Sequence, residues 1–372
     1  MRGRILLAVG SIVVCLLGAE VLLAVVVPQV HRLPDIWMHD ARLGWTHRPG
    51  TMGRMVTPEF DVAYSIDAAG RRRHESQAGP DAVRLQLYGD SFAEGWGVDV
   101  ADGLAARLET HLVSSRGVGV TNYGTAGYGT DQEMLLFADA GAPQSPDVVL
   151  LLFYANDVWN NVSRRGIGAR RGAKPFFRPS QDGALHLMGT PIPEPEPPSP
   201  SLARTLKERF HLWALGRKAW TRKVPVPPQQ MMQFYGGLYG TDSARYRPVW
   251  DLTEKLLAEF ALLCRQAGAT FVLIYAPAIV QIEADDWRTK RELHDLTGDY
   301  DLSHPNRHLG DIAGRHGISF IDLTPAFQTA AREQILYFRD SHWNEAGHRL
   351  AANVIAAALV DEGIAGLLES DD

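Results

Sequence analysis

The sequence predicts an α/β protein with a three-layer α/β/α arrangement. Five short apolar runs, rich in branched and aromatic residues, have the character of buried strands, and helical patterns lie between or after them. Near-continuous apolar strands joined by helices indicate a parallel sheet that helices cover on both faces. The predicted strands are 83–88, 118–123, 148–154, 270–275 and 318–323, and the predicted helices are 104–113, 132–140, 246–265, 308–316 and 344–359.

The chain is longer than one ordinary core requires. Its 372 residues therefore predict a main domain with insertions or a small second module. We expect the main domain to span residues 83–365. The charged fraction of 22% and the net charge of -6 give no indication of a nucleic-acid partner. Cys15 and Cys264 lie in unrelated segments, so the cysteines do not indicate the compartment.

The N-terminal segment is almost uninterrupted apolar sequence. Residues 5–27 are about long enough to span a bilayer, and Arg2 and Arg4 precede them. Because positive charge favours the cytoplasmic side, we expect residues 1–31 to form a transmembrane signal-anchor, with the N-terminus cytoplasmic and the rest outside. A cleaved signal peptide is the alternative, although no small-x-small cleavage site is evident. Glu20 interrupts the run, and snorkelling, a partner helix or simple tolerance would each explain it.

Residues 32–82 contain too many turn signals for a helical segment. Gly44-Trp45 and the stretch 47–50 have the composition of turns, while residues 60–66 alternate as a half-buried strand does. We therefore expect a small β-rich module that packs against the main domain.

A Gly-Asp-Ser sequence follows the first predicted strand. Gly89 allows a sharp exit from that strand, and Ser91 lies at its carboxyl end, where ligands bind in open α/β sheets. A serine there can be a nucleophile, although an isolated Gly-Asp-Ser more often marks a residue that caps the next helix. Three more stretches at the ends of apolar runs favour the nucleophile: Asn-Tyr-Gly-Thr-Ala-Gly at 122–127, Tyr-Ala-Asn-Asp at 154–157 and Asp-Ser-His-Trp-Asn at 340–344.

In this order the four stretches resemble the four sequence blocks of the SGNH (GDSL-type) hydrolase family. The resemblance covers roughly residues 84–160 and 268–360. It implies a five-stranded parallel sheet of flavodoxin-like arrangement and an enzyme that hydrolyses esters.

The resemblance also implies a role for each polar residue of these blocks. Ser91 matches the nucleophile, and Asp340 and His342 match the acid and the base of a catalytic triad. The backbone N–H groups of Ser91 and Gly127 and the side-chain amide of Asn156 match the oxyanion hole. No cofactor is expected, and no metal, because the sequence offers no second pair of ligands at metal spacing.

The chemistry of the last block depends on its backbone. If the chain is still extended after the apolar run 335–338, the side chains of Asp340 and His342 point to the same side. Asp340 would then hold the Nδ1 hydrogen of His342 and leave Nε2 free to take the proton of Ser91. Each donor aimed at the developing oxyanion is worth roughly 3 kcal/mol of barrier.

Two departures from the family pattern leave the reaction open. No glycine precedes Asn156, and Asp340-x-His342 is one residue shorter than the usual Asp-x-x-His. The short spacing resembles SGNH-type proteins that acetylate alginate and related polysaccharides. We therefore expect an esterase acting on O-acyl esters, acetyl first, of a glycan, lipid or small molecule, with acyl transfer to an exported polysaccharide as the alternative. A catalytically inactive, membrane-tethered carbohydrate-binding protein is the second alternative, but retention of every catalytic position favours an enzyme.

An insertion at about 158–245 interrupts the alternation of strands and helices. Residues 191–200 are so dense in proline that they predict an extended segment. Because the insertion follows the third block, we expect it beside or over the active site. Residues 201–224 carry an excess of basic residues with apolar ones between them, which fits a helix on an anionic membrane surface or an ordinary docked helix.

Overall fold

The computed structural model divides the chain into two compact units, which are described separately. It describes residues 2–29, 32–74, 76, 78–112, 117–166, 172–196, 206, 209–221, 228–241, 243–361 and 363. The larger unit comprises Ile36–Thr51, Ser65–Pro195 and Pro227–Asp372, and the smaller unit comprises Met1–Asp35, Met52–Tyr64 and Glu196–Val226.

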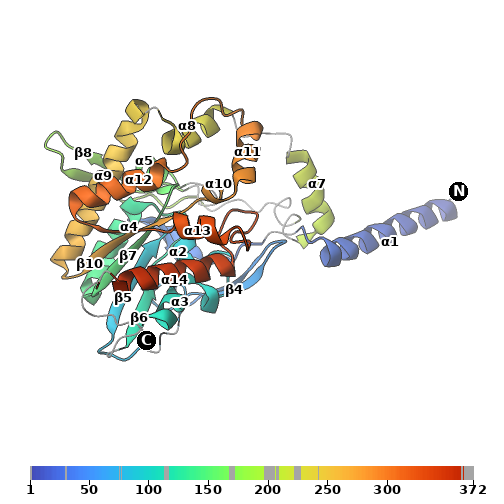
Figure 1. Ribbon diagram of the computed structural model, residues 1–372. Helices are drawn as coiled ribbons and strands as arrows, with labels where there is room; N and C mark the ends of the chain where they lie inside the picture. The colour runs from blue at the N-terminus through green and yellow to red at the C-terminus, as the bar shows by residue number, and fades with distance from the viewer. Residues whose placement is uncertain are drawn as a thin grey trace. The chain divides into compact units, whose positions relative to one another are not determined.

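A five-stranded parallel sheet forms the centre of the larger unit (Figure 1). Its order is β11-β10-β7-β5-β6, and every pair of neighbours is parallel. Numbered along the chain this order is 2-1-3-4-5 from β6 to β11, the flavodoxin-like arrangement. The strands are β5 (Val83–Gly89), β6 (Val118–Asn122), β7 (Val148–Tyr154), β10 (Thr270–Ala276) and β11 (Ser319–Asp322). The predicted fold class is confirmed, and each predicted strand end lies within one residue of the observed one.

Helices cover both faces of this sheet. Helix α3 packs against α14, whereas α4 and α5 pack against α9, and Figure 1 shows the sheet between the two groups. The side chains of Val148 to Phe153 in the central strand β7 are wholly buried, as a parallel strand covered on both faces requires. The helices of the larger unit are α2 (Ser91–Glu94), α3 (Leu104–His111), α4 (Thr130–Leu136), α5 (Asp157–Val162), α8 (Pro228–Tyr239), α9 (Ser243–Gln266), α10 (Ile279–Ile282), α11 (Ala284–Leu293), α12 (His304–His316), α13 (Thr324–Ala330) and α14 (Glu345–Asp361).

Small antiparallel hairpins supplement the central sheet. Strand β1 (Trp37–Asp40) pairs with β2 (Gly44–His47) in the larger unit. Strand β8 (Phe176–Pro179) pairs with β9 (Leu185–Met188) inside the predicted insertion, where the sequence had indicated no strand. The strand predicted near residues 60–66 is β4 (Asp61–Ser65), and it pairs with β3 (Met52–Val56). Of the proline-rich stretch, residues 197–200 lie outside the described residues.

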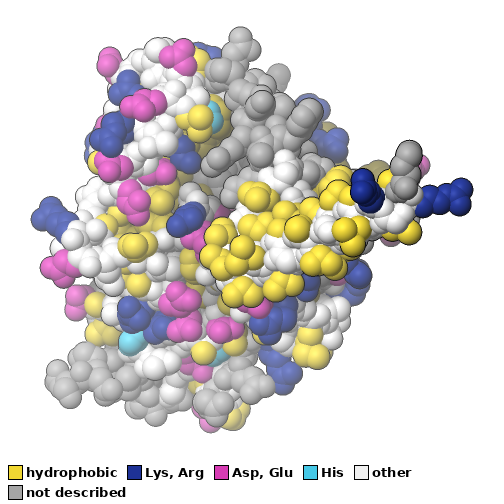
Figure 2. Space-filling view, turned by 90° about the vertical axis from the view of Figure 1, so that its right-hand side faces the viewer, with side chains coloured by type: hydrophobic (Ala, Val, Ile, Leu, Met, Phe, Trp, Pro, Cys, Tyr) yellow, Lys and Arg dark blue, Asp and Glu magenta, His cyan; other side chains and the backbone are white. Residues whose placement is uncertain are grey.

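The smaller unit contains one long apolar helix, α1 (Arg2–Val26). It is 25 residues long and apolar enough to cross a membrane, a test that a signal sequence also passes. None of its side chains is buried, and Figure 2 shows hydrophobic side chains gathered along it.

A second helix, α7 (His211–Thr221), explains the acid within α1. The two carboxylate oxygens of Glu20 accept the backbone N–H groups of His211 and Leu212. The first N–H groups of a helix have no partner inside it, so a carboxylate stabilises that end. Of the predicted basic helix around α7, residues 201–205, 207, 208 and 222–224 lie outside the described residues.

Candidate active site

The turn after β5 presents Ser91 at the end of the strand. Asp90 caps the following helix, because its Oδ1 accepts the N–H of Phe92 at 2.9 Å. Capping is thus done by the residue before Ser91, and the hydroxyl of Ser91 is left for another partner. Gly89 has φ +150°, and a Cβ there would lie 2.8 Å from the carbonyl oxygen of Leu152, so the exit from β5 requires glycine.

The partner of the serine hydroxyl is a histidine 251 residues further along the chain. Ser91 Oγ and His342 Nε2 are 2.9 Å apart, within hydrogen-bond distance. His342 Nδ1 lies 3.2 Å from Asp340 Oδ1, an ion-pair distance at which the ring N–H is not yet aligned for a regular hydrogen bond. Such contacts often tighten only when substrate binds. The structure therefore brings the three predicted triad residues together.

The backbone between Asp340 and His342 corrects one expectation. The chain is not extended there but turns, since Ser341 has φ +74° and its N–H donates to the carbonyl of Phe338 at 3.0 Å. Asp340 Oδ1 also accepts the backbone N–H of His342 at 3.1 Å. A tight turn, rather than the alternation of a strand, brings the carboxylate to the imidazole, because the aspartate side chain bonds its own backbone two residues on.

A tryptophan holds the other oxygen of this carboxylate. Trp96 Nε1 donates to Asp340 Oδ2 at 3.2 Å, and its ring stacks on His342 with centroids 5.3 Å apart. Partial burial would raise the pKa of Asp340, but His342 and Trp96 outweigh it and hold that pKa below its ordinary value. In the sequence, Trp96 is recognisable only as an aromatic residue close to Ser91.

The predicted oxyanion donors lie at the ends of the next two strands. Gly127 follows β6 and has φ +82°, a conformation that favours glycine. Asn156 follows β7, and its Nδ2 donates one hydrogen to Asp90 Oδ2 at 3.0 Å, which leaves its second hydrogen available. Within the described chain, the N–H groups of Ser91 and Gly127 donate to no protein acceptor. All three donors are thus available to a substrate.

Sequence reasoning missed the link between Asp90 and Asn156. Asp90 fixes the turn that carries the serine, and its second oxygen also orients the amide of Asn156. Burial raises the pKa of Asp90, and the hydrogen bonds from Phe92 and Asn156 oppose that rise. No local sequence pattern predicts a contact between residues that are 66 positions apart.

Further buried acids lie behind this turn. Asp157 Oδ2 accepts the N–H of Tyr154 at 3.1 Å, and Asp131 pairs with the buried Lys174. Glu133 is wholly buried, and neither carboxylate oxygen has a hydrogen-bond partner among the described residues. Burial, together with neighbouring acids, raises the pKa of Glu133 well above its ordinary value. Burial and the neighbouring Glu133 raise the pKa of Asp157 well above its ordinary value as well. Asp157 accepts a hydrogen bond that favours its ionised form, whereas Glu133 accepts none among the described residues, so we expect the proton on Glu133 first.

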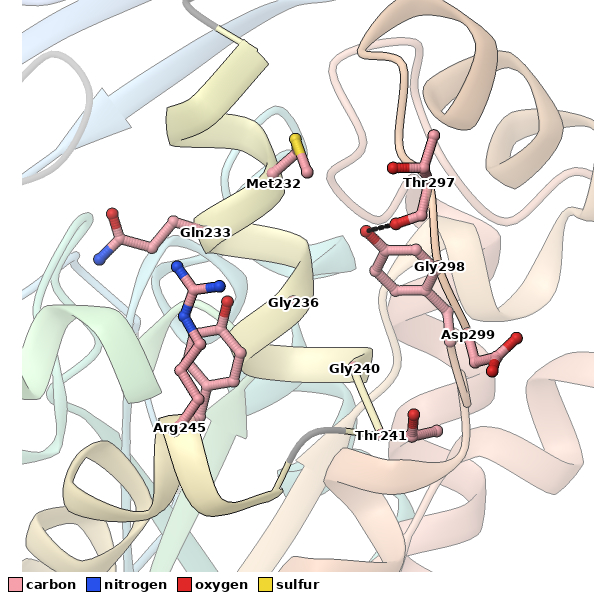
Figure 3. Close-up of a pocket in the computed structure, with 11 residues that line it drawn as sticks. Met232, Gln233, Gly236, Gly240, Thr241, Arg245, Thr297, Gly298 and Asp299 are labelled. Atoms are coloured by element: carbon pink, nitrogen blue, oxygen red, sulfur yellow. Dashed lines mark hydrogen bonds between the residues drawn. The ribbon is translucent and has the colours of Figure 1, made fainter.

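A cavity of about 550 Å³ lies elsewhere in the larger unit (Figure 3). It is formed by the C-terminal half of α8, the start of α9 and residues 297–300. Arg245 and Gln233 line one side in the close-up, and Thr297 and Asp299 line the other. The cavity contains none of the predicted catalytic residues, but α8 and Arg245 come from the predicted insertion.

The parallel sheet, with polar residues gathered at the carboxyl ends of its strands, defines this protein as an α/β enzyme. A model of the GDSL-like Lipase/Acylhydrolase family matches residues 87–350, more than half of the chain. The chain therefore belongs to this family and is an ester hydrolase of the SGNH type, as the sequence blocks predict.

Several solved structures are also similar to this chain, at low identity. LAE5, an alpha/beta hydrolase from the metagenome of Lake Arreo, Spain, is 18% identical, with a TM-score of 0.40 over 76% of this chain and 95% of its own. A variant of Axe2, an acetyl xylan esterase from Geobacillus stearothermophilus, is 15% identical, with a TM-score of 0.41 over 76% and 95%. A lipolytic G-D-S-L family protein from Veillonella parvula is 16% identical, with a TM-score of 0.38 over 75% and 97%. No curated protein matches the sequence.

Proposed function

We propose that this protein is a serine esterase that removes O-acyl groups, above all acetyl groups, from a glycan or lipid outside the membrane. The observation that carries the proposal is the 2.9 Å contact between Ser91 Oγ and His342 Nε2 at the end of β5. A serine paired with a base in this way is an activated nucleophile.

Acylation begins when Ser91 Oγ attacks the ester carbonyl. His342 Nε2 takes the hydroxyl proton, and Asp340 stabilises the imidazolium that forms. The carbonyl oxygen becomes an oxyanion, which the N–H groups of Ser91 and Gly127 and the amide of Asn156 stabilise by roughly 3 kcal/mol each. The intermediate collapses, the C–O bond to the alcohol breaks, and the alcohol leaves with the proton from His342.

Deacylation repeats these steps with water. His342 Nε2 takes a proton from a water molecule, whose oxygen attacks the acyl-Ser91 carbonyl. The second oxyanion is held by the same three donors. Collapse breaks the bond to Ser91 Oγ, which recovers its proton from His342 and releases the carboxylic acid.

The mechanism predicts that Ser91→Ala and His342→Ala each remove nearly all esterase activity without unfolding the protein. The double variant should be no worse than either single variant, because residues that act as a unit do not contribute additively. Full-length protein in detergent, assayed on p-nitrophenyl acetate with circular dichroism as the folding control, provides the test. A folded Ser91→Ala protein with full activity would end the proposal.

Transfer of the acyl group to a polysaccharide hydroxyl is the second candidate function. It is supported by the short Asp340-x-His342 spacing, which resembles that of polysaccharide acetylating proteins. A sugar hydroxyl would replace water as the attacking group, with the same proton transfer to His342. Incubation with an activated acetyl ester, with and without alginate or xylan oligosaccharides, separates the two. Acetylated sugar formed at the expense of free acetate would establish transfer, and acid release alone would establish hydrolysis.

The proposal also places the catalytic domain on the outer side of a membrane, tethered by α1. The apolar length of α1 and the two arginines before the apolar run support this topology. We expect the protein to fractionate with membranes and to be digested by protease added from the outer side. Recovery of a shortened soluble form would show instead that the segment is a cleaved signal.

A further inference from the structure

The peptide group between Ala126 and Gly127 is held by its carbonyl. Trp45 Nε1 donates to the carbonyl oxygen of Ala126 at 3.1 Å, and the indole is only 5% exposed. In a trans peptide the carbonyl and the following N–H point in opposite directions. A hold on the oxygen of Ala126 therefore sets the direction of the Gly127 N–H.

This hold matters because residue 127 is a glycine. Gly127 lets a ligand approach its N–H closely, but glycine adopts positive and negative φ about equally readily. Rotation of the Ala126–Gly127 peptide, which would turn the donor away, therefore meets little local resistance. The hydrogen bond from Trp45 supplies that resistance from outside the loop.

Trp45 is itself held in place by residues that follow Gly127 in the chain. The hydroxyl of Tyr128 donates to the carbonyl of Trp45, and the two rings meet edge to face with centroids 5.5 Å apart. Gln132 Nε2 donates to the carbonyl of Leu43 at 2.7 Å. The hairpin that contains β2 is thus tied to the residues on both sides of Gly127.

The N–H of Ala126 is held by the helix that carries the nucleophile. Glu94, the last residue of α2, accepts this N–H with Oε2, and His47 Nε2 lies 3.4 Å from the same oxygen. Burial would raise the pKa of Glu94, but His47 and the Ala126 N–H outweigh it and hold that pKa below its ordinary value. Glu94 is therefore an ionised acceptor. Trp45 and His47 are two positions apart on β2, so their side chains leave the same face of the strand.

From these contacts we infer that Trp45 is a positioning residue of the oxyanion hole, and that it aims the Gly127 N–H at the reacting carbonyl. The inference rests on the proposed roles of Ser91 and Gly127. Trp45 lies before residues 87–350, so a part of the chain outside the family match completes the active site.

Trp45→Phe tests this inference, since phenylalanine keeps an aromatic ring against Tyr128 but has no N–H. Trp250→Phe is the matched control, because Trp250 is also 5% exposed and its Nε1 also donates to a backbone carbonyl, that of Gly237, at 3.1 Å. Both variants, in full-length protein in detergent, are assayed on p-nitrophenyl acetate and on the matching thionoester. Sulfur is a weak acceptor, so the preference for the oxygen ester reports on oxyanion donors.

We expect Trp45→Phe to lower kcat roughly tenfold or more on the oxygen ester, with little change in KM, because the donor acts in the transition state. The preference for the oxygen ester over the thionoester should shrink with it. Trp250→Phe should lower the melting temperature about as much as Trp45→Phe does. It should leave kcat and the preference for the oxygen ester unchanged. Equal kinetic losses in the two variants, or an unchanged preference in Trp45→Phe, would overturn the inference.

Two further variants keep the result interpretable. Tyr128→Phe loosens Trp45 without altering the indole, and it should shift kcat and the preference in the same direction, so it decides the question if Trp45→Phe does not fold. An unchanged preference in a folded Tyr128→Phe protein would then count against the inference. Ser91→Ala distinguishes failure of the inference about Trp45 from failure of the proposed esterase function, because an active Ser91→Ala protein refutes the proposed function itself.

Discussion

Replacement of Asn156 by alanine should separate catalysis from stability at this site. The change removes one oxyanion donor, which predicts a fall in kcat of about a hundredfold to a thousandfold on an activated ester. It also removes the hydrogen bond to Asp90 Oδ2, whose side chain is 1% exposed. A buried acceptor left without its partner costs about 1–3 kcal/mol of folding stability. In a domain of this size that loss lowers the melting temperature by only several degrees, at roughly 2–4 °C for each kcal/mol.

The control for Asn156→Ala lies five residues further along the chain. Asn161 is wholly buried in α5, where its Nδ2 donates to Thr253 Oγ1 and its Oδ1 accepts the N–H of Asp131, each at 3.3 Å, and neither partner is a predicted site residue. Asn161→Ala should therefore lower the melting temperature comparably while kcat stays within about threefold of the parent. Steady-state kinetics and thermal unfolding on the same samples give both quantities. If kcat of a folded Asn156→Ala protein is within threefold of the parent, Asn156 is not an oxyanion donor.

Three other variants probe the supporting contacts. Trp96→Phe keeps a ring near the imidazole but loses the N–H to Asp340, so kcat should fall about three- to tenfold, as expected for roughly 1 kcal/mol; an unchanged kcat would contradict this. Glu133→Gln should be at least as stable as the parent at pH 8 in urea titrations. The folded parent keeps a proton on Glu133 that the unfolded chain releases above the ordinary pKa of 4.5, so the parent protein loses folding stability as pH rises from there. The advantage of the glutamine variant should therefore vanish near pH 4. Lys174→Met leaves Asp131 buried without its ion pair, which should cost about 3–5 kcal/mol in the same titrations; a loss below 1 kcal/mol would mean that Asp131 is neutral.

The central sheet was predictable because its chemistry is local. A strand buried on both faces is apolar at nearly every position, so β7 and β10 stand out from the polar sequence around them. The serine turn was predictable for a related reason, since Gly89 and Asp90 act on their immediate neighbours. Parallel strands then bring their carboxyl ends to one edge, which is why residues far apart in the sequence were expected at one site.

The supporting contacts could not be predicted because they join distant residues. Trp45 reaches Ala126 across 81 positions, and Trp96 reaches Asp340 across 244. Indole groups are common in cores, and nothing in the neighbouring sequence tells a packed tryptophan from one whose N–H holds a catalytic loop. The turn at Ser341 was not predicted for another reason. A non-glycine residue with positive φ is uncommon, and the preceding apolar run favoured an extended chain.

That turn bears on the choice between hydrolysis and transfer. The short spacing suggested transfer by resemblance. In the structure, however, the carboxylate of Asp340 still lies beside the imidazole of His342, because the chain turns at Ser341. The same proton transfers serve water and a sugar hydroxyl alike, so the triad by itself does not select the acceptor. Selection requires an acceptor held close to the acyl-Ser91 carbonyl while water is excluded, and such positioning is worth up to about 7–11 kcal/mol. The triad therefore leaves the choice of acceptor to the surrounding chain. The predicted insertion at about 158–245 begins directly after Asn156 and Asp157, so we expect substitutions in it to change acceptor preference without changing hydrolysis of a small activated ester.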